Sequence, residues 1–210
     1  MRQLQPNPDS GSLGTLYAAD VNNKIFGYDL KRITVHSPSE HTIEGTSYDL
    51  EIQFEFDIKS EFSDVSRTQA NLAIMYTTST SGSTSNFIEM FMEVGDYTKN
   101  LNELISTDLP NPLVYFAYEG SKTIASCEEI VNWYVLEQAL PMSKTQLDVF
   151  TTLWAGNQAF AEGRGNNREI NESNSRIIKK GGIQCEEQFI YFFSFILLYA
   201  FINYFIFKLL

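Results

Sequence analysis

Strict alternation of apolar and polar residues makes residues 48–58, YDLEIQFEFDI, the clearest element of the chain. Every second residue is apolar, and the positions between are acidic or amide residues. Because successive side chains of a strand point to opposite faces, this pattern predicts a strand with one face on a core and the other on water or a cavity. Glu51, Gln53 and Glu55 then share the polar face of that strand.

Further short apolar runs predict a chain built mainly of strands. They are residues 71–78, 87–94, 113–120 and 131–136. A polar loop, STSGSTSN, separates the first two of these runs. Short strands that alternate with polar turns favour an antiparallel sheet.

Helical patterns are few. In MSKTQLDVFTTLW, Ser143 is placed as an N-cap with Gln146 three residues later, and Met142 and Leu147 are placed for a hydrophobic staple. Residues 97–106 show a weaker helical pattern. The predicted fold class is therefore mainly β, a mostly antiparallel sheet with a few short helices.

The last apolar run is long enough to change the picture of the whole chain. Residues 189–207 contain no charged residue in 19 positions. At ~1.5 Å per residue, a helix of this length crosses most of a ~30 Å hydrocarbon core. The run predicts either a transmembrane helix or the hydrophobic tail of a lipid-anchor signal, for which Gly181 and Gly182 are the small residues upstream. Both alternatives attach the chain to a membrane.

Composition and charge narrow the remaining possibilities. The 210 residues are 43% hydrophobic and carry a net charge of −11, which excludes a surface for nucleic acid. Residues 1–14 are predicted as an irregular segment and residues 171–188 as a linker, since both are polar and rich in turn residues. Cys127 and Cys185 are the two cysteines, and their number does not choose between free thiols and a disulfide.

Both histidines of the chain lie in one short motif. His36 and His41 belong to HSPSEHTIEGTSYDLEIQF, which resembles the S-E-H-T-x-x-G and Y-x-x-E-x-H patterns of the alpha-class carbonic anhydrases. The segments NFIEMFMEVGD, YFAYEGSKTIASCEEIVNWYVLEQ and GNNRE resemble later motifs of that family, in the same order. The resemblance covers roughly residues 15–170, which we assign to one alpha-carbonic-anhydrase-like domain. It implies a twisted sheet that lacks the amino-terminal part of the family domain.

The same resemblance implies a metal site that has lost ligands. The family binds zinc with three histidines, two on one strand and one on its neighbour, and these positions fall on Thr34, His36 and Gln53. Only His36 keeps the residue type of a ligand. The resemblance assigns Glu51 and His41 to the support of a ligand or of the local structure, without contact to metal.

Other site positions are partly retained. Thr123 and Glu40 match the threonine and glutamate that orient a zinc-bound hydroxide. Glu55 and Lys122 stand where the family has an apolar wall, and a charge in such a wall must be hydrated or paired. A pair between Glu55 and Lys122 across the cavity is one prediction.

We therefore interpret the chain as a membrane-attached, carbonic-anhydrase-like protein without catalytic activity, which binds a protein partner that the sequence does not identify. No cofactor is expected in that case. The alternative is an active zinc carbonic anhydrase, a carbonate dehydratase, in which Glu51 or Glu55 replaces lost ligands. If a signal peptide precedes the given start, the domain is expected to be extracellular or lumenal.

Overall fold

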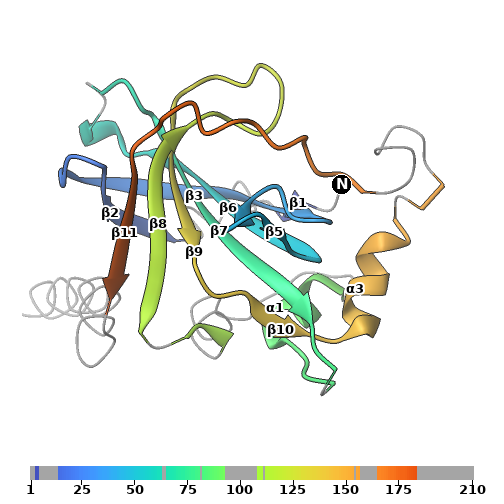
Figure 1. Cartoon of the computed structure of the whole chain (residues 1–210). Helices are drawn as coiled ribbons and strands as arrows, with labels where there is room; N and C mark the ends of the chain where they lie inside the picture. The colour runs from blue at the N-terminus through green and yellow to red at the C-terminus, as the bar shows by residue number, and fades with distance from the viewer. Residues whose placement is uncertain are drawn as a thin grey trace, which may run out of the picture.

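The computed structural model describes residues 3–4, 14–62, 65–80, 82–92, 108–110, 112–153, 155–156 and 165–183. Strands predominate, as the sequence pattern predicted (Figure 1). The strands are β1 (Gln3–Leu4), β2 (Thr15–Ala19), β3 (Ile25–His36), β4 (Thr42–Ile43), β5 (Thr46–Ser47), β6 (Leu50–Ile58), β7 (Gln69–Thr78), β8 (Leu113–Gly120), β9 (Val131–Leu136), β10 (Leu140–Met142) and β11 (Ile178–Ile183). The helices are the 3-10 turn η1 (Ser60–Phe62), α1 (Asn86–Met92) and α3 (Lys144–Thr151).

One curled sheet contains most of these strands. Its order is β1-β3-β6-β7-β9-β8-β11, with β2 paired to β3 and β10 paired to β7. All pairs are antiparallel except β7–β9 and β10–β7. The strands β4 and β5 form a separate two-stranded hairpin. The prediction of a twisted, mostly antiparallel sheet is thereby confirmed.

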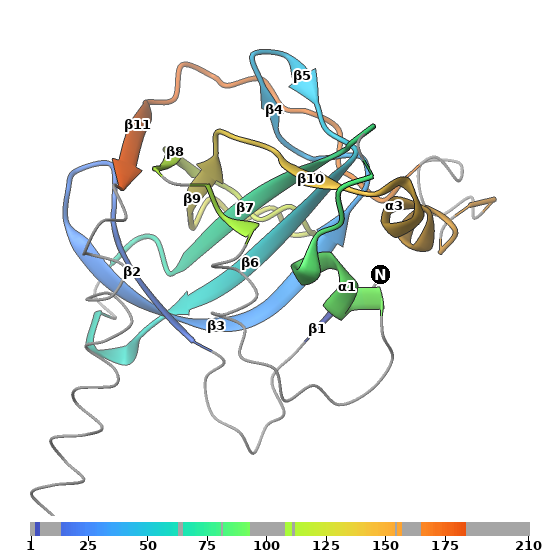
Figure 2. The ribbon, with the colours of Figure 1, turned by 90° about the horizontal axis from the view of Figure 1, so that it is seen from below.

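The two faces of the sheet have different chemistry. The apolar face packs into the main core, to which α1 and α3 contribute Phe87, Ile88, Leu147 and Phe150. Figure 2 shows both helices at one end of the sheet. The other face carries the polar residues of β3 and β6 and a smaller core around Trp133. Glu51 and Gln53 are fully buried there, so the polar face of β6 lies inside the molecule.

A bulge in β3 decides which of its residues reach the polar face. The register shifts between Leu30, which opposes Phe56, and Arg32, which opposes Glu55. Leu30 and Ile33 can therefore both pack into the main core, although they are three residues apart. Arg32, Thr34 and His36 consequently share the polar face.

The predicted strand at 87–94 is wrong for residues 87–92, which form α1. The Ser85 hydroxyl accepts a hydrogen bond from the Ile88 amide at 3.1 Å, as an N-cap does. The side-chain amide of Gln146 accepts from the Ser85 amide at 3.1 Å and donates to its carbonyl at 2.8 Å. This long-range contact fixes the start of α1. The sequence prediction failed here because a short apolar run alone does not distinguish a helix from a strand.

The helix predicted after Ser143 is confirmed as α3. The Ser143 side chain accepts from the Gln146 amide, and the Gln146 side chain accepts from the Ser143 amide, so the capping box is complete. The weaker helix predicted at 97–106 lies outside the described residues. So do residues 189–207, whose membrane segment stays a prediction. Within the part of the chain that the structure describes, no helix is long and apolar enough to cross a membrane.

Two segments predicted as irregular contribute strands. Gln3 and Leu4, within the predicted irregular segment 1–14, pair with Thr34 and Ile33 of β3. Within the predicted linker 171–188, β11 pairs with residues 113–118 of β8 and continues the sheet past residue 170. Its sequence, IKKGGI, has no alternation, because this edge strand leaves most side chains exposed.

Candidate functional site

The polar face of β3 and β6 brings the expected metal positions together. Thr34 stands opposite Gln53, and His36 stands opposite Glu51, in the antiparallel pairing of the two strands. All four residues are at least 98% buried. The structure therefore places the three predicted ligand positions, Thr34, His36 and Gln53, side by side.

His36 has the orientation of a ligand with one nitrogen free. Its Nδ1 lies 3.2 Å from Glu40 Oε1 and 3.4 Å from the Asn166 carbonyl oxygen, and both are acceptors, so Nδ1 carries the proton. Its Nε2 is buried and has no hydrogen-bond partner among the described residues. Burial lowers the pKa of His36, but the bond to Glu40 and the charges of Glu40 and Glu51 raise the pKa above its usual value.

Gln53 occupies the centre of the polar face and uses its whole amide. Its Nε2 donates to Glu40 Oε2 and to Glu51 Oε1, each at 2.9 Å. Its Oε1 accepts from the Thr123 hydroxyl at 3.4 Å. The predicted pair of Thr123 and Glu40 is therefore linked through Gln53, and no direct hydrogen bond joins the two within the described residues. Both polar atoms of the amide therefore have hydrogen-bond partners within the protein.

Thr34 and the charged wall residues are engaged elsewhere. The Thr34 hydroxyl donates to Glu55 Oε1 at 3.3 Å, and Arg32 forms an ion pair with Glu55 Oε2 at 2.5 Å. Lys122 pairs with Glu128 at 2.6 Å. The predicted pair of Glu55 and Lys122 is therefore wrong. Arg32 lies beside Glu55 because of the bulge in β3, and Lys122 reaches a nearer acid in its own loop.

Glu51 and His41 form a buried ion pair beside this cluster. The His41 Nδ1 lies 2.8 Å from Glu51 Oε1, and the amides of Glu40 and His41 donate to Glu51 Oε2 at 2.8 Å each. Burial raises the pKa of Glu51, but the charge and hydrogen bonds of His41 lower it to about 2. Burial lowers the pKa of His41, and the Glu51 charge raises it above 6.5 overall. The His41 Nε2 also bonds to the Tyr118 hydroxyl at 2.7 Å.

Zinc does not fit the side chains present. Among the described residues, no group of three or more His, Cys, Asp or Glu side chains is placed to hold a metal ion. Of the three ligand positions, only His36 offers a free atom, and three strong ligands are the requirement for a catalytic zinc site. Glu51 and Glu55, the predicted replacement ligands, are already bound by His41 and Arg32.

Sequence reasoning missed several residues of the polar face. Asn71 of β7 stands opposite Glu55, and its Oδ1 is buried without a partner among the described residues. Asn166 donates to the Val35 carbonyl at 2.8 Å and accepts from the Ser37 amide at 2.9 Å, which holds residues 165–168 against the end of β3. For Asn71 the strand register was needed. For Asn166, the likeness of GNNRE to a family motif was the available signal.

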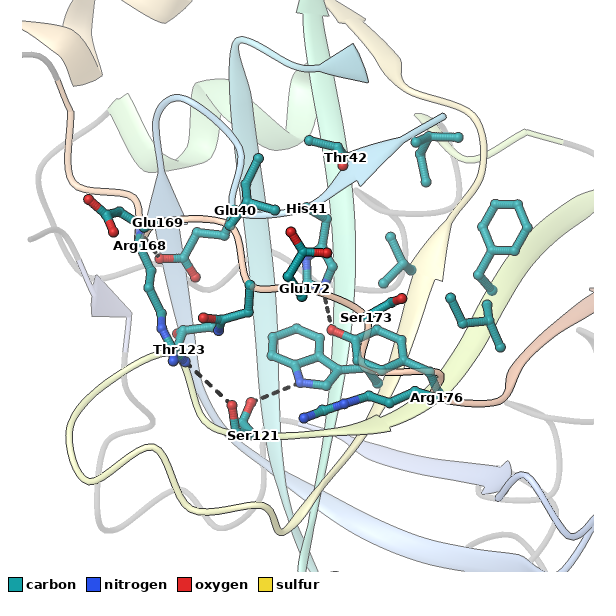
Figure 3. Close-up of a pocket in the computed structure, with 18 of the residues that line it drawn as sticks. Glu40, His41, Thr42, Ser121, Thr123, Arg168, Glu169, Glu172, Ser173 and Arg176 are labelled. Carbon is teal, nitrogen blue, oxygen red and sulfur yellow. Dashed lines mark hydrogen bonds between the residues drawn. The ribbon is translucent and has the colours of Figure 1, made fainter. Parts of the chain in front are cut away.

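A cavity of about 460 Å³ lies next to the buried cluster. Figure 3 shows Arg168, Glu172 and Arg176 of the 168–176 segment around this cavity, together with His41 and Thr123. Glu40, His41 and Thr123 belong to its wall, so the cavity adjoins the predicted site. Exposed Cys127 forms no disulfide within the described residues. Cys185 lies outside them, so the state of the pair stays open.

The curled sheet and the polar row of β3 and β6 define an alpha-carbonic-anhydrase-like domain. The family model for eukaryotic-type carbonic anhydrase matches residues 15–181. The chain belongs to the carbonic anhydrase family.

Individual relatives agree with this assignment. A carbonic anhydrase of Neisseria gonorrhoeae is 30% identical over 153 residues, which are 72% of this chain and 55% of that protein. A carbonic anhydrase of Dunaliella salina is 33% identical over 155 residues, 67% of this chain and 25% of that protein. The crystal structure of a halotolerant carbonic anhydrase from the same alga superposes with a TM-score of 0.62 at 24% identity, covering 77% of this chain and 64% of that one. The chain thus spans between a quarter and about half of the length of these curated relatives.

Proposed function

We propose that this protein is a carbonic-anhydrase-like binding or scaffold module that does not hydrate carbon dioxide. The observation that carries the proposal is the occupation of two of the three ligand positions. The Thr34 hydroxyl is bound to Glu55, the Gln53 amide is bound to Glu40, Glu51 and Thr123, and only His36 has a free nitrogen.

The chemistry of the family reaction explains why this matters. A zinc ion held by three protein ligands lowers the pKa of a bound water to about 7, which makes hydroxide available at neutral pH. One imidazole does not hold zinc in that geometry. Without the ion, the Thr123 hydroxyl has no metal-bound hydroxide to orient and donates to Gln53 instead. These contacts support a protein without a cofactor.

An active enzyme with altered ligands is the second candidate, and one observation favours it. The His36 ring is oriented through Nδ1 by Glu40 and Asn166 and leaves Nε2 free, as a metal ligand does. Glu51 and Glu55 would have to leave His41 and Arg32 to join it. Removing one partner of a buried ion pair costs about 3–5 kcal/mol, which opposes that exchange.

Zinc content separates the two candidates. The full chain and its Thr34→His/Gln53→His variant are purified in zinc-containing buffer, and bound zinc is measured by elemental analysis. We expect no stoichiometric zinc in the natural chain and close to one zinc per chain in the variant. A Thr34→Asn/Gln53→Asn variant is the matched control, because it disturbs the same hydrogen bonds without adding imidazoles. Stoichiometric zinc and carbon dioxide hydration by the natural chain would refute the proposal.

Attachment to a membrane through residues 189–207 is part of the proposal. The support is the uncharged apolar run in the sequence, which is separated from the end of β11 by five residues. We propose an extracellular or lumenal domain and a protein partner. Alkaline extraction of membranes from expressing cells is the test: the full chain should stay in the pellet, and a chain ending at residue 187 should not. Phospholipase release of the full chain would identify a lipid anchor.

A further inference from the structure

The cavity beside the buried cluster has an apolar floor and a polar roof. Its floor is formed by Phe116, Tyr118, Trp133 and Val135 of β8 and β9. Ile43 of the β4–β5 hairpin adds to one side. A volume of about 460 Å³ is in the range of cavities that hold small organic molecules.

Two guanidinium groups belong to the wall, and among the described residues one of them is paired with a carboxylate. Arg176 forms an ion pair with Glu129 at 2.7 Å. The guanidinium of Arg168 donates to the Ser121 hydroxyl at 3.4 Å and to the Lys122 carbonyl at 3.1 Å, which are both uncharged. Within the described residues no carboxylate lies in ion-pair distance of Arg168. Its remaining N–H groups are suited to a carboxylate, which a guanidinium binds through two parallel hydrogen bonds.

The cavity wall also contains acidic side chains that have no partner within the described residues. Glu172, Glu169 and Glu44 contribute to the wall and are exposed, and no ion pair or hydrogen bond engages their carboxylates within the described part of the chain. In Figure 3 the Glu172 carboxylate lies beside His41 at the cavity, whereas that of Glu169 points away from the cavity. Glu40, the fourth acid of the wall, is held by His36, Gln53 and the Arg168 amide.

We propose that this cavity binds a small zwitterion, namely a free α-amino acid with an apolar side chain. Its carboxylate pairs with Arg168, its ammonium group pairs with Glu172, and its side chain lies on the aromatic floor. A ligand with both charges matches both unpaired groups of the wall. A simple anion leaves Glu172 unmatched, and a simple cation leaves Arg168 unmatched. The inference rests on the proposed binding role and gives that role a ligand class.

Three related phenylalkyl probes test the charge pattern. They are L-phenylalanine, 3-phenylpropionate, which lacks the ammonium group, and 2-phenylethylamine, which lacks the carboxylate. Binding to the full chain in mild detergent is followed by tryptophan fluorescence, since Trp133 is part of the floor, and by calorimetry. We expect phenylalanine to bind with a Kd below about 1 mM and each analogue to bind at least about tenfold more weakly.

Variants assign the two charges. Glu172→Gln should weaken the binding of phenylalanine about tenfold and leave the binding of 3-phenylpropionate unchanged. Arg168→Gln should weaken the binding of phenylalanine about tenfold and leave the binding of 2-phenylethylamine unchanged. Glu169→Gln is the matched control in the same segment and should change nothing. If Arg168→Gln does not fold, Arg168→Lys, which keeps the charge, is measured in its place.

Equal affinity for the three probes, or no saturable binding of phenylalanine below about 1 mM, overturns the proposal. Zinc content is measured on the same preparations. A zinc-free chain that does not bind phenylalanine refutes the ligand class alone, and a zinc-loaded chain refutes the proposed function.

Discussion

Replacing Glu51 by Gln tests the buried network at its most constrained point. The amides of Glu40 and His41 donate to one carboxylate oxygen, and the His41 ring and the Gln53 amide donate to the other, at 2.8–2.9 Å. In the variant, one oxygen becomes an NH2 group. Whichever way the new amide turns, its NH2 group faces two donors and accepts from neither. The charge opposite His41 is lost as well.

The magnitude follows from the pKa. A fall from 4.5 to about 2 on folding corresponds to roughly 3 kcal/mol of stability carried by the ionised carboxylate of Glu51. The side chain is completely buried, so solvent does not screen this interaction. Loss of one partner of a buried ion pair costs about 3–5 kcal/mol in other proteins, which agrees with this value. We expect Glu51→Gln to lower the free energy of unfolding by about 3 kcal/mol at neutral pH.

Urea unfolding of the full chain, followed by tryptophan fluorescence, measures this difference. The control is Glu128→Gln, which removes an acid from an exposed pair with Lys122 and should leave the unfolding midpoint unchanged. Because the pKa of Glu51 is depressed, its contribution is present above pH 4.5 and is lost as the pH falls toward 2. The variant should lack that part of the acid transition. A loss smaller than about 1 kcal/mol would refute the reasoning.

Three further changes have defined outcomes. The pKa of His41 is raised in the folded protein, so the contribution of His41 to stability is complete below pH 6.5 and is lost as the pH rises through the folded-state pKa. His41→Gln should therefore remove this decline in stability from urea midpoints measured up to about pH 9. A decline that is unchanged in the variant would contradict the prediction. Ser143→Ala removes the N-cap of α3 and should lower the free energy of unfolding, measured in urea, by about 1 kcal/mol. An unchanged free energy of unfolding would mean that the cap does not stabilise the protein. Gly165→Ala places a methyl group 2.3 Å from the Ser37 carbonyl oxygen and should lower stability by about 1–3 kcal/mol, so a thermal midpoint equal to the natural one would disprove the contact.

Local patterns predicted the parts of the fold that depend on neighbours in sequence. The alternation in β6 identified its two faces, and Ser143 with Gln146 identified the start of α3. The same alternation placed Gln53 with Glu51 on one face, and the resemblance to the family motif placed Gln53 at a ligand position. These features need only backbone geometry and a few adjacent residues.

Contacts between distant segments were beyond such reasoning. The helix α1 depends on Ser85 and Gln146, which are 61 residues apart. The partner of Glu55 depends on the bulge that turns Arg32 toward it. Occupation of the Gln53 amide requires Glu51 of the same strand together with Glu40 and Thr123 from two separate loops. The resemblance placed Thr34 and Gln53 at ligand positions, but only the coordinates show that Thr34 donates to Glu55 and that Gln53 bonds to Glu40, Glu51 and Thr123.

The outermost strand of the sheet has a bearing on how the protein behaves in concentrated solution. β11 is the edge strand: it pairs with β8 on one side, and no other strand of the described chain pairs with its second side. Residues 179–182 of this edge are two lysines and two glycines. Like charges on successive copies repel, and glycines offer no side chains for cross-strand packing. Lys180 also lies over the Phe116 ring at 5.6 Å, which covers part of an aromatic surface. The edge is therefore protected against the strand-to-strand growth that leads to fibrils.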